Sequence, residues 1–380
     1  MIRAGLIVPF RSESLGGANY YYNLLSCYQR HPDPDLTLAV FTDYADDAAV
    51  YRCDAIELHA LPGLKSNPLL NYPRRAARRL LHYDPVFLRT LEKQRIDLVT
   101  HRRLGEQSKI NTLHWQQDFQ HKALPGFFDA ADCARRDHAI NSTLHWGNIL
   151  LSSQAAANDF RRYYPDLKSV ETHVLHFSGA SALNEVLLSR EQLEAHYPVR
   201  EPYFFLPNQF WQHKNHGVVV EALRLLPKTI RVICSGFMDD YRNHGYVPEL
   251  LTRVKEAGVE DRFVCLGVVP YSLLVSLMHH SLAVLQPSLF EGWSTSVEES
   301  KALCKQIVLS NLDVHLEQAP ERGRFFAPDS PAELAAHMKQ IYAEFDPAIE
   351  QAFVEQRITR KNIAETEWVV QFAEILKKVA

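Results

Sequence analysis

The chain has 380 residues, which is too many for one ordinary hydrophobic core and suits two domains. Its apolar fraction of 46% and charged fraction of 23% are typical of a globular protein, and a formal net charge of −4 gives no general basis for nucleic-acid binding. The six cysteines are dispersed without a Cys-x-x-Cys pair, which argues against a disulfide framework or a cysteine zinc site and indicates reduced thiols in a cytoplasmic protein.

Apolar runs alternate with helical patterns through the first half. The run 1–9 is too short for a signal peptide and predicts a first strand, and no stretch is long enough to span a membrane. A polar loop ending in Gly16 and Gly17 follows, where backbone can approach a ligand, although a plain tight turn explains the pair as well. The loop lacks the Gly-x-Gly-x-x-Gly and P-loop fingerprints. Further strands are predicted at 36–41, 96–100, 111–115 and 148–152.

A basic segment lies between the second and third of these strands. On a helix its four arginines would share one face, because they fall at i, i+1, i+4 and i+5: Arg74, Arg75, Arg78 and Arg79. The ordinary meaning of such a run is a solvated face. The functional alternative is a patch for an anionic membrane or for an acceptor diphosphate.

The strand pattern at 111–115 leads into a loop that is rich in polar groups. Asp118 and His121 in this loop are suited to binding sugar hydroxyls or handling a proton. The structural alternative is a helix start, with Asp118 as the N-cap and His121 in the first turn.

Small residues at 178–182 follow a strand predicted at 170–177, and we place the domain boundary there. The second half repeats the alternation, with strands predicted at 203–206, 230–234, 262–266, 282–285 and 307–309. After the first of these strands, Lys214 enters a helix from a loop, as a phosphate ligand does, although a solvated lysine fits the same position. The last stretch, 366–379, has apolar residues at helical spacing.

The stretch 282–309 reads as strand, loop, helix and strand, one unit of a parallel sheet. Ligands of open α/β sheets bind at the carboxyl ends of strands, where this loop lies. The small residues Ser294, Thr295 and Ser296 at the helix start leave N–H groups that can meet an anion.

Carboxylates stand on both sides of that anion site, Glu291 before the turn and Glu299 in the first helical turn. A phosphate flanked by hydroxyl-bearing groups, as in a nucleotide sugar, would suit them. The alternative is a capping box, in which Glu299 only satisfies its own helix end. That alternative leaves Glu291 and Gly292 unexplained.

These motifs resemble the retaining glycosyltransferases of family 4, also called glycosyl transferases group 1, and within them a bacterial polysaccharide-assembly subgroup. The resemblance rests on two glutamates separated by seven residues, on Asp-Phe-Gln-His at 118–121 and on Asn-Gln-Phe-Trp-x-His-Lys-Asn-His at 208–216. It implies the GT-B fold, an α/β architecture of two Rossmann-like domains facing across a cleft. The acceptor-binding domain would be 1–178, the nucleotide-sugar domain 179–365, and the helix 366–380 would cross back.

The resemblance also implies residue roles. Glu291 would contact the donor sugar, Glu299 the ribose and Lys214 the diphosphate. His121 would face the donor sugar, and with Asp118, Glu291 and Lys214 it completes the predicted catalytic set. The remaining nucleotide-sugar contacts would come from Gly16, Gly17, Asn208, Gln209, Gly236, Val268, Gly292, Ser294, Thr295 and Ser296. The sequence departs from the family in two segments: Asn208 and Gln209 stand where it usually has an arginine, and Gly292-Trp293-Ser294 replaces its Gly-Phe-Gly.

The implied activity is hexose transfer with retention, without metal or cofactor, from a nucleotide sugar to a glycan or lipid-linked acceptor in polysaccharide biosynthesis. A UDP-sugar is favoured as donor, and the enzyme would be cytoplasmic with a peripheral membrane contact. One alternative is a GT-B nucleotide-sugar epimerase. The other is a non-catalytic nucleotide-sugar-binding protein, which the absence of the family's arginine favours.

Overall fold

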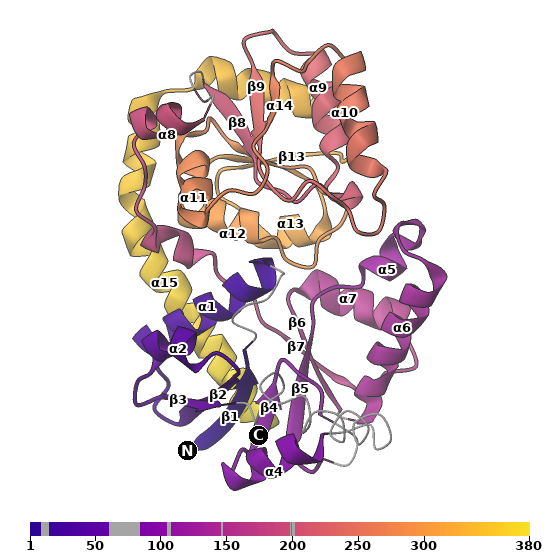
Figure 1. Ribbon diagram of the computed structural model, residues 1–380, viewed down its shortest axis with the longest axis vertical. Coiled ribbons are helices and arrows are strands. Elements are labelled where there is room, and N and C mark those ends of the chain that lie inside the picture. Colours follow the sequence, from indigo (N-terminus) through magenta and orange to yellow (C-terminus); the bar gives the residue numbers. More distant parts are fainter. Residues whose placement is uncertain (9–14, 61–83, 105–107, 146, 198, 200–201) are drawn as a thin grey trace. The chain divides into compact units, whose positions relative to one another are not determined.

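The computed structural model describes residues 1–8, 15–60, 84–104, 108–145, 147–197, 199 and 202–380 (Figure 1). The chain forms two compact units. The first contains Met1–Asp118, Arg135–Phe177 and Ile363–Ala380, and the second contains Phe119–Ala134 and Ser178–Asn362. The predicted N-terminal domain, 1–178, therefore includes a segment, 119–134, that the structure groups with the second unit. The arginines at 74–79 lie outside the described residues.

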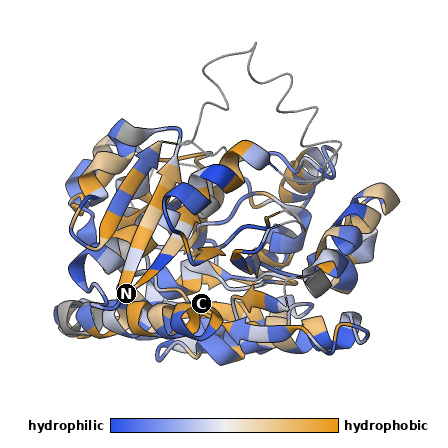
Figure 2. Cartoon of the chain, turned by 90° about the horizontal axis from the view of Figure 1, so that it is seen from below, coloured by the Kyte–Doolittle hydropathy of each residue, from blue (hydrophilic) through white to orange (hydrophobic). Residues whose placement is uncertain are grey.

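The first unit is built on a seven-stranded parallel sheet in the order β3-β2-β1-β4-β5-β6-β7. The strands are β1 (Ile2–Ile7), β2 (Leu36–Thr42), β3 (Ile56–Ala60), β4 (Leu98–Thr100), β5 (Asn111–Gln116), β6 (Asn148–Leu151) and β7 (Glu171–Val174). Every residue of β2 is buried, as expected for a parallel strand covered on both faces. Figure 2 shows hydrophobic residues along the strands beside the N-terminus and mixed colours on the surrounding helices.

Helices from both ends of the chain cover this sheet. They are α1 (Leu15–Arg30), α4 (Pro85–Lys93), α6 (Ala130–Asn141, in part), α7 (Gln154–Tyr163) and the last part of α15 (Pro347–Val379). Leu24 and Tyr28 of α1 share one core with Trp368 and Phe372 of α15. Arg30 reinforces the contact, because its guanidinium lies 2.7 Å from the buried carboxylate of Glu365.

The second unit has a six-stranded parallel sheet in the order β10-β9-β8-β11-β12-β13. Its strands are β8 (Tyr203–Leu206), β9 (Arg231–Cys234), β10 (Phe263–Cys265), β11 (Val284–Gln286), β12 (Ile307–Ser310) and β13 (Gly323–Phe326). Its main helices are α8 (Arg190–His196), α9 (His216–Arg224), α10 (Tyr246–Glu256), α11 (Tyr271–His280), α12 (Thr295–Ala302), α13 (Asp313–Gln318) and α14 (Pro331–Glu344). The short α5 (Gln120–Ala123) also belongs to this unit.

The two strands that the sequence analysis missed, β3 and β13, each lie at the edge of a sheet. An edge strand has one neighbour and is less covered, so it does not need a continuous apolar run. Accordingly β3 alternates Ile-Glu-Leu-His, and β13 begins with Gly323 and Arg324. The predicted glycine loop also differs from the structure, which places Gly16 and Gly17 in the first turn of α1.

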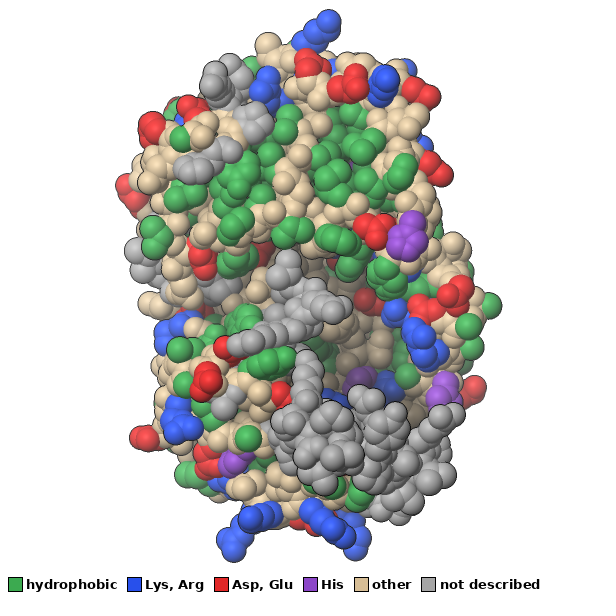
Figure 3. Space-filling view, in the orientation of Figure 1, with side chains coloured by type: hydrophobic (Ala, Val, Ile, Leu, Met, Phe, Trp, Pro, Cys, Tyr) green, Lys and Arg blue, Asp and Glu red, His purple; other side chains and the backbone are tan. Residues whose placement is uncertain are grey.

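The surface shown in Figure 3 carries scattered charged side chains, with hydrophobic side chains gathered in patches on the second unit. No helix in the described part of the chain is both long and apolar enough to cross a bilayer.

Candidate functional site

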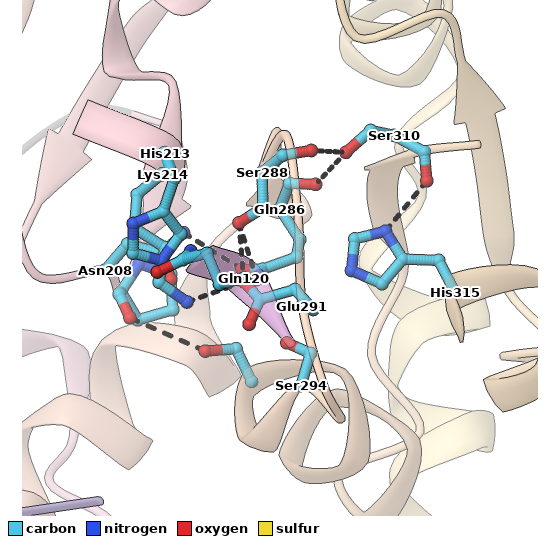
Figure 4. A network of polar contacts seen from close by, with 12 residues as sticks. Gln120, Asn208, His213, Lys214, Gln286, Ser288, Glu291, Ser294, Ser310 and His315 are labelled. Atoms are coloured by element: carbon cyan, nitrogen blue, oxygen red, sulfur yellow. Dashed lines mark hydrogen bonds and ion pairs between the residues drawn. The ribbon is translucent and has the colours of Figure 1, made fainter. Parts of the chain in front are cut away.

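Polar residues meet in the second unit where β8, β11 and β12 end. The sheet order changes direction between β8 and β11, so this edge is the switch point at which open α/β sheets bind ligands. Figure 4 shows Asn208, His213 and Lys214 on one side of Glu291 and His315 on the other. The predicted residues Asn208, Lys214 and Glu291 are thus brought together by loops that are far apart in the sequence.

One oxygen of Glu291 is the centre of this cluster. Its Oε1 accepts hydrogen bonds from Lys214 Nζ at 2.5 Å, Gln286 Nε2 at 2.8 Å and Ser288 Oγ at 2.6 Å. Gln286 is held in turn by Asn208, whose Nδ2 donates to Gln286 Oε1 at 2.9 Å. The second oxygen of Glu291 accepts no hydrogen bond from any residue in the described part of the chain, so it can accept one from a ligand.

The charge state of this cluster follows from its contacts. Burial alone would raise the pKa of Glu291, but the Lys214 charge and the hydrogen bonds from Lys214 and Ser288 outweigh it and lower that pKa. Burial, aided by the Lys214 charge, lowers the pKa of His213 to about 3. At neutral pH the cluster therefore holds a Glu291 carboxylate and a neutral His213.

Asn215 fixes the loop that carries Lys214. This residue adopts a left-handed conformation (φ 56°), which asparagine tolerates better than most residues. Its Nδ2 donates to the carbonyl of Pro287 at 3.1 Å and to that of Pro328 at 2.9 Å. The loop after β8 is thereby tied to the loop after β11, which sets the position of Lys214 against Glu291.

The start of α12 is held by a residue that the sequence analysis missed, Gln318 of α13. Its side-chain amide bonds both backbone groups of Ser294, donating to the carbonyl at 3.0 Å and accepting from the N–H at 3.3 Å. Its Nε2 also donates to Glu298 Oε1 at 2.9 Å. The first N–H groups of a helix have no partner within the helix, and α12 has no side-chain cap. Gln318 thus fixes the direction of N–H groups that can meet an anion.

The capping-box alternative for Glu299 is wrong. The helix begins at Thr295 with Ser294 as N-cap. Glu299 therefore lies beyond the first turn, whereas the sequence predicted it within that turn. Its Oε1 instead accepts a hydrogen bond from the Tyr271 hydroxyl at 2.7 Å. Burial raises the pKa of Glu299 to about 7, and the Tyr271 hydrogen bond opposes that rise only in part. Glu299 therefore titrates near neutral pH.

His121 is buried in the short helix α5 of the same unit. The structural alternative required Asp118 to be the N-cap of this helix. The N-cap is instead Phe119, and no side chain caps the helix. Asp118 belongs to the first unit, as do Gly16 and Gly17.

Arg242, a second residue that the sequence analysis missed, joins the segment of His121 to the loop of Lys214. Its guanidinium donates to Gln120 Oε1 at 2.7 Å, to His213 Nδ1 at 3.1 Å and to Asp240 Oδ1 at 3.1 Å. It also lies over the ring of Phe128, 5.1 Å from the centroid. These partners are distant in sequence, so no local pattern could have identified Arg242.

Four predicted residues lie at the ends of β8, β9 and β10. Gly236 has φ 152°, and a Cβ there would lie 2.2 Å from the carbonyl oxygen of Asn208, so only glycine fits. Gln209 Oε1 accepts the N–H of Phe237 at 2.7 Å, and Gly236 N–H donates to Gly267 at 2.9 Å. Val268, next in the chain, is 55% exposed. Asn208, Gln209, Gly236 and Val268 thus border one edge of the sheet.

Within the described residues, no group of three or more His, Cys, Asp or Glu side chains is arranged to hold a metal ion. Metal independence stays a prediction.

Comparisons with known proteins agree with this geometry. Residues 190–355, which contain the cluster around Glu291, match the family Glycosyl transferases group 1. No curated protein sequence matches the chain.

Solved structures match over the whole chain at low identity. HepE from Anabaena in complex with UDP is 15% identical, with full coverage of both chains and a TM-score of 0.68. A glycosyltransferase from Rickettsia africae is 14% identical over 100% of this chain and 98% of its own (TM-score 0.68). Sucrose-phosphate synthase from Thermosynechococcus elongatus is 16% identical over 100% and 99% (TM-score 0.68). These likenesses confirm the predicted fold: two Rossmann-like α/β units, as in GT-B glycosyltransferases.

Proposed function

We propose that the protein is a glycosyltransferase that moves a hexose from a UDP-sugar to a glycan or lipid-linked acceptor, with retention at the anomeric carbon and without a metal. The observation that carries this proposal is the Lys214–Glu291 ion pair beside the uncapped start of α12, at the switch point of the second sheet. The group 1 family match over 190–355 and the UDP bound to HepE support it.

The proposed chemistry follows from where charge develops. The diphosphate gains negative charge as the bond to the sugar breaks, and groups that meet this charge in the transition state accelerate the reaction. An ammonium has three donors, and Glu291 uses one at 2.5 Å. Lys214 can give the others to the diphosphate, together with the N–H groups at the start of α12.

Glu291 would position the donor sugar through its second oxygen. We do not assign it as a nucleophile, because three hydrogen bonds hold its Oε1. His121 would face the donor sugar, and Glu299 would accept hydrogen bonds from the ribose hydroxyls. Polysaccharide assembly remains the proposed setting, and contact with a membrane surface remains part of the proposal.

A ligand panel followed by a transfer assay tests this function. UDP and UDP-sugars should raise the melting temperature more than GDP and GDP-mannose, since a ligand that binds only the native state stabilises it. Transfer to an acceptor should release UDP and should continue in EDTA. Loss on chelation with rescue by Mg²⁺ would contradict the metal-free mechanism. Interconversion of a free UDP-sugar without UDP release would instead indicate an epimerase, and binding without turnover a non-catalytic protein.

Replacing Glu299 by glutamine should change stability in a pH-dependent way. The pKa of Glu299 is about 7 in the folded protein and 4.5 ordinarily, so its ionisation destabilises the fold progressively from about pH 4.5 and fully above about pH 7. Glutamine does not ionise. The variant should therefore gain about 2–3 kcal/mol relative to wild type between pH 5 and pH 8 in urea unfolding. An equal difference at both pH values would contradict the shifted pKa.

The same variant tests the ribose contact. An ionised Glu299 that accepts two ribose hydroxyls should lose about 1–3 kcal/mol of UDP affinity on replacement by glutamine, the range for hydrogen bonds to charged groups. Isothermal titration with UDP at pH 8 measures this. An unchanged dissociation constant would remove Glu299 from the nucleotide site.

A further inference from the structure

A second group of polar side chains lies in the first unit, outside the site around Glu291. The first sheet changes direction between β1 and β4, so the residues that follow β4 stand at its switch point. Those residues are His101, Arg102 and Arg103, and the neighbouring strand β5 contributes His114. None of these four residues is a predicted site residue on the sequence alone.

His101 fixes the turn that ends β4. It adopts a left-handed conformation (φ 66°), which is uncommon for a residue other than glycine. Three contacts hold it there: its N–H donates to the carbonyl of Leu113 at 2.8 Å, Nδ1 lies 2.8 Å from Thr100 Oγ1, and Nε2 lies 2.6 Å from the Tyr20 hydroxyl. Strained backbone held this firmly concentrates at functional sites.

Arg103 is a half-buried cation that has no counterion among the described residues. Its Nε is fully buried and has no hydrogen-bond partner, and no ion pair or hydrogen bond of its guanidinium occurs with any described residue. Burial lowers the pKa of Arg103 to about 10, which still leaves it charged at neutral pH. A desolvated charge without a partner is costly, so proteins ordinarily pair it.

The charge of Arg103 acts on the neighbouring ring of His114. Burial, followed by the Arg103 charge, lowers the pKa of His114 to about 3, so the ring is neutral. Its Nδ1 is also fully buried and without a hydrogen-bond partner in the described part of the chain. Two unsatisfied polar atoms at one switch point therefore remain for a ligand to satisfy.

We propose that Arg103 and His114, held by the turn at His101, bind a phosphate group on the acceptor. This inference rests on the proposed function, because it names the chemical class of the second substrate. The edge of a guanidinium, Nε–H and one NH₂ group, fits two oxygens of an anion. Phosphate offers a third oxygen for a neighbouring polar atom such as His114 Nδ1, whereas a carboxylate offers only two.

Titration of the full chain with inorganic phosphate tests the site. The Nε–H resonance of Arg103, identified by its disappearance in Arg103→Gln, should shift as phosphate is added. Phosphate affinity measured by ³¹P NMR should fall at least tenfold in Arg103→Gln and less in Arg103→Lys, which keeps the charge. Arg89→Gln, which removes an exposed arginine of α4 in the same unit, should match wild type. Equal phosphate affinity in wild type and Arg103→Gln would overturn the proposal.

UDP binding separates this proposal from the proposed function. Lys214, Glu291 and Glu299, to which the proposed function assigns the contacts with UDP and the donor sugar, lie in the other unit. UDP affinity should therefore be the same in wild type and Arg103→Gln, which also shows that the variant is folded. Phosphate binding at Arg103 in a protein that does not bind UDP would contradict the glycosyltransferase proposal and support the phosphate site. UDP binding without a shift of the Arg103 resonance would support the glycosyltransferase proposal and contradict the phosphate site.

Two further ligands distinguish the source of the phosphate. A soluble hexose phosphate that shifts the Arg103 resonance would support a soluble acceptor. A shift produced only by phosphatidylcholine vesicles that contain phosphatidic acid, and not by plain vesicles, would support a lipid-linked acceptor. A resonance that responds to neither would overturn the assignment to the acceptor.

Discussion

Glycosyl transfer is expected to fall by about 10²–10³-fold when Lys214 is replaced by alanine, the loss that follows removal of one preorganised donor from a developing negative charge. Lys214 is the cation bonded to Glu291, at 2.5 Å. Asn208 and Gln209 stand where the family that the motifs resemble usually has an arginine. The loss should appear mainly in kcat, since the contact strengthens as the leaving group gains charge. Steady-state assays with a UDP-sugar measure it.

The same change should also destabilise the second unit. Both side chains of the ion pair are largely buried, and removing one partner leaves the Glu291 carboxylate without its cation, at a cost of about 3 kcal/mol. Gln286 and Ser288 still donate to Glu291, so the fold should survive. Lys228→Ala, at an exposed lysine of the same unit, should leave activity and stability unchanged. Wild-type turnover in Lys214→Ala would show that the diphosphate is held elsewhere.

Replacing Gly179 by alanine should destabilise the second unit by about 3 kcal/mol or more, the upper range for overpacking, because the clash is with backbone. A Cβ at Gly179 would lie 2.4 Å from the amide nitrogen of Glu299 and 2.5 Å from the carbonyl carbon of Glu298. Neither atom can move without moving α12. The variant should therefore unfold at lower urea concentration and bind UDP more weakly.

Gly126→Ala is the matched control for this effect. Gly126 belongs to the same unit, its φ is not in the left-handed region, and nothing lies within 4 Å of a Cβ there. Its replacement should change neither stability nor UDP affinity appreciably. If Gly179→Ala were as stable as Gly126→Ala, the close approach to α12 would not matter for the site.

The sequence by itself determined the α/β class, the two Rossmann-like units and most strands of both sheets. Buried parallel strands such as β2, β8 and β12 are nearly continuous apolar runs, which are visible without any knowledge of their neighbours. The edge strands β3 and β13 escaped because they have only one neighbour and keep polar residues.

The loops that carry Lys214 and Glu291 could also be identified from the sequence, since each follows a recognisable strand and ligand sites gather at strand ends. The contacts that the side chains in those loops make could not be identified from the sequence. Glu299 fits a capping box by spacing, yet its partner is Tyr271, which begins another helix. Gly179 looked like part of a linker, yet it packs against the backbone of α12.

Only the tertiary structure decided how the site is held. Gln318 bonds both backbone groups of Ser294, which is 24 positions away in the chain. Arg242 bonds Gln120, 122 positions away, and His213, 29 positions away. Turn and helix patterns record contacts within a few residues, whereas these bonds depend on which strand ends the folded sheet brings together. The sequence alone does not distinguish a polar loop residue that faces water from one that holds the start of a helix. Burial against a specific partner in the folded protein distinguishes the two.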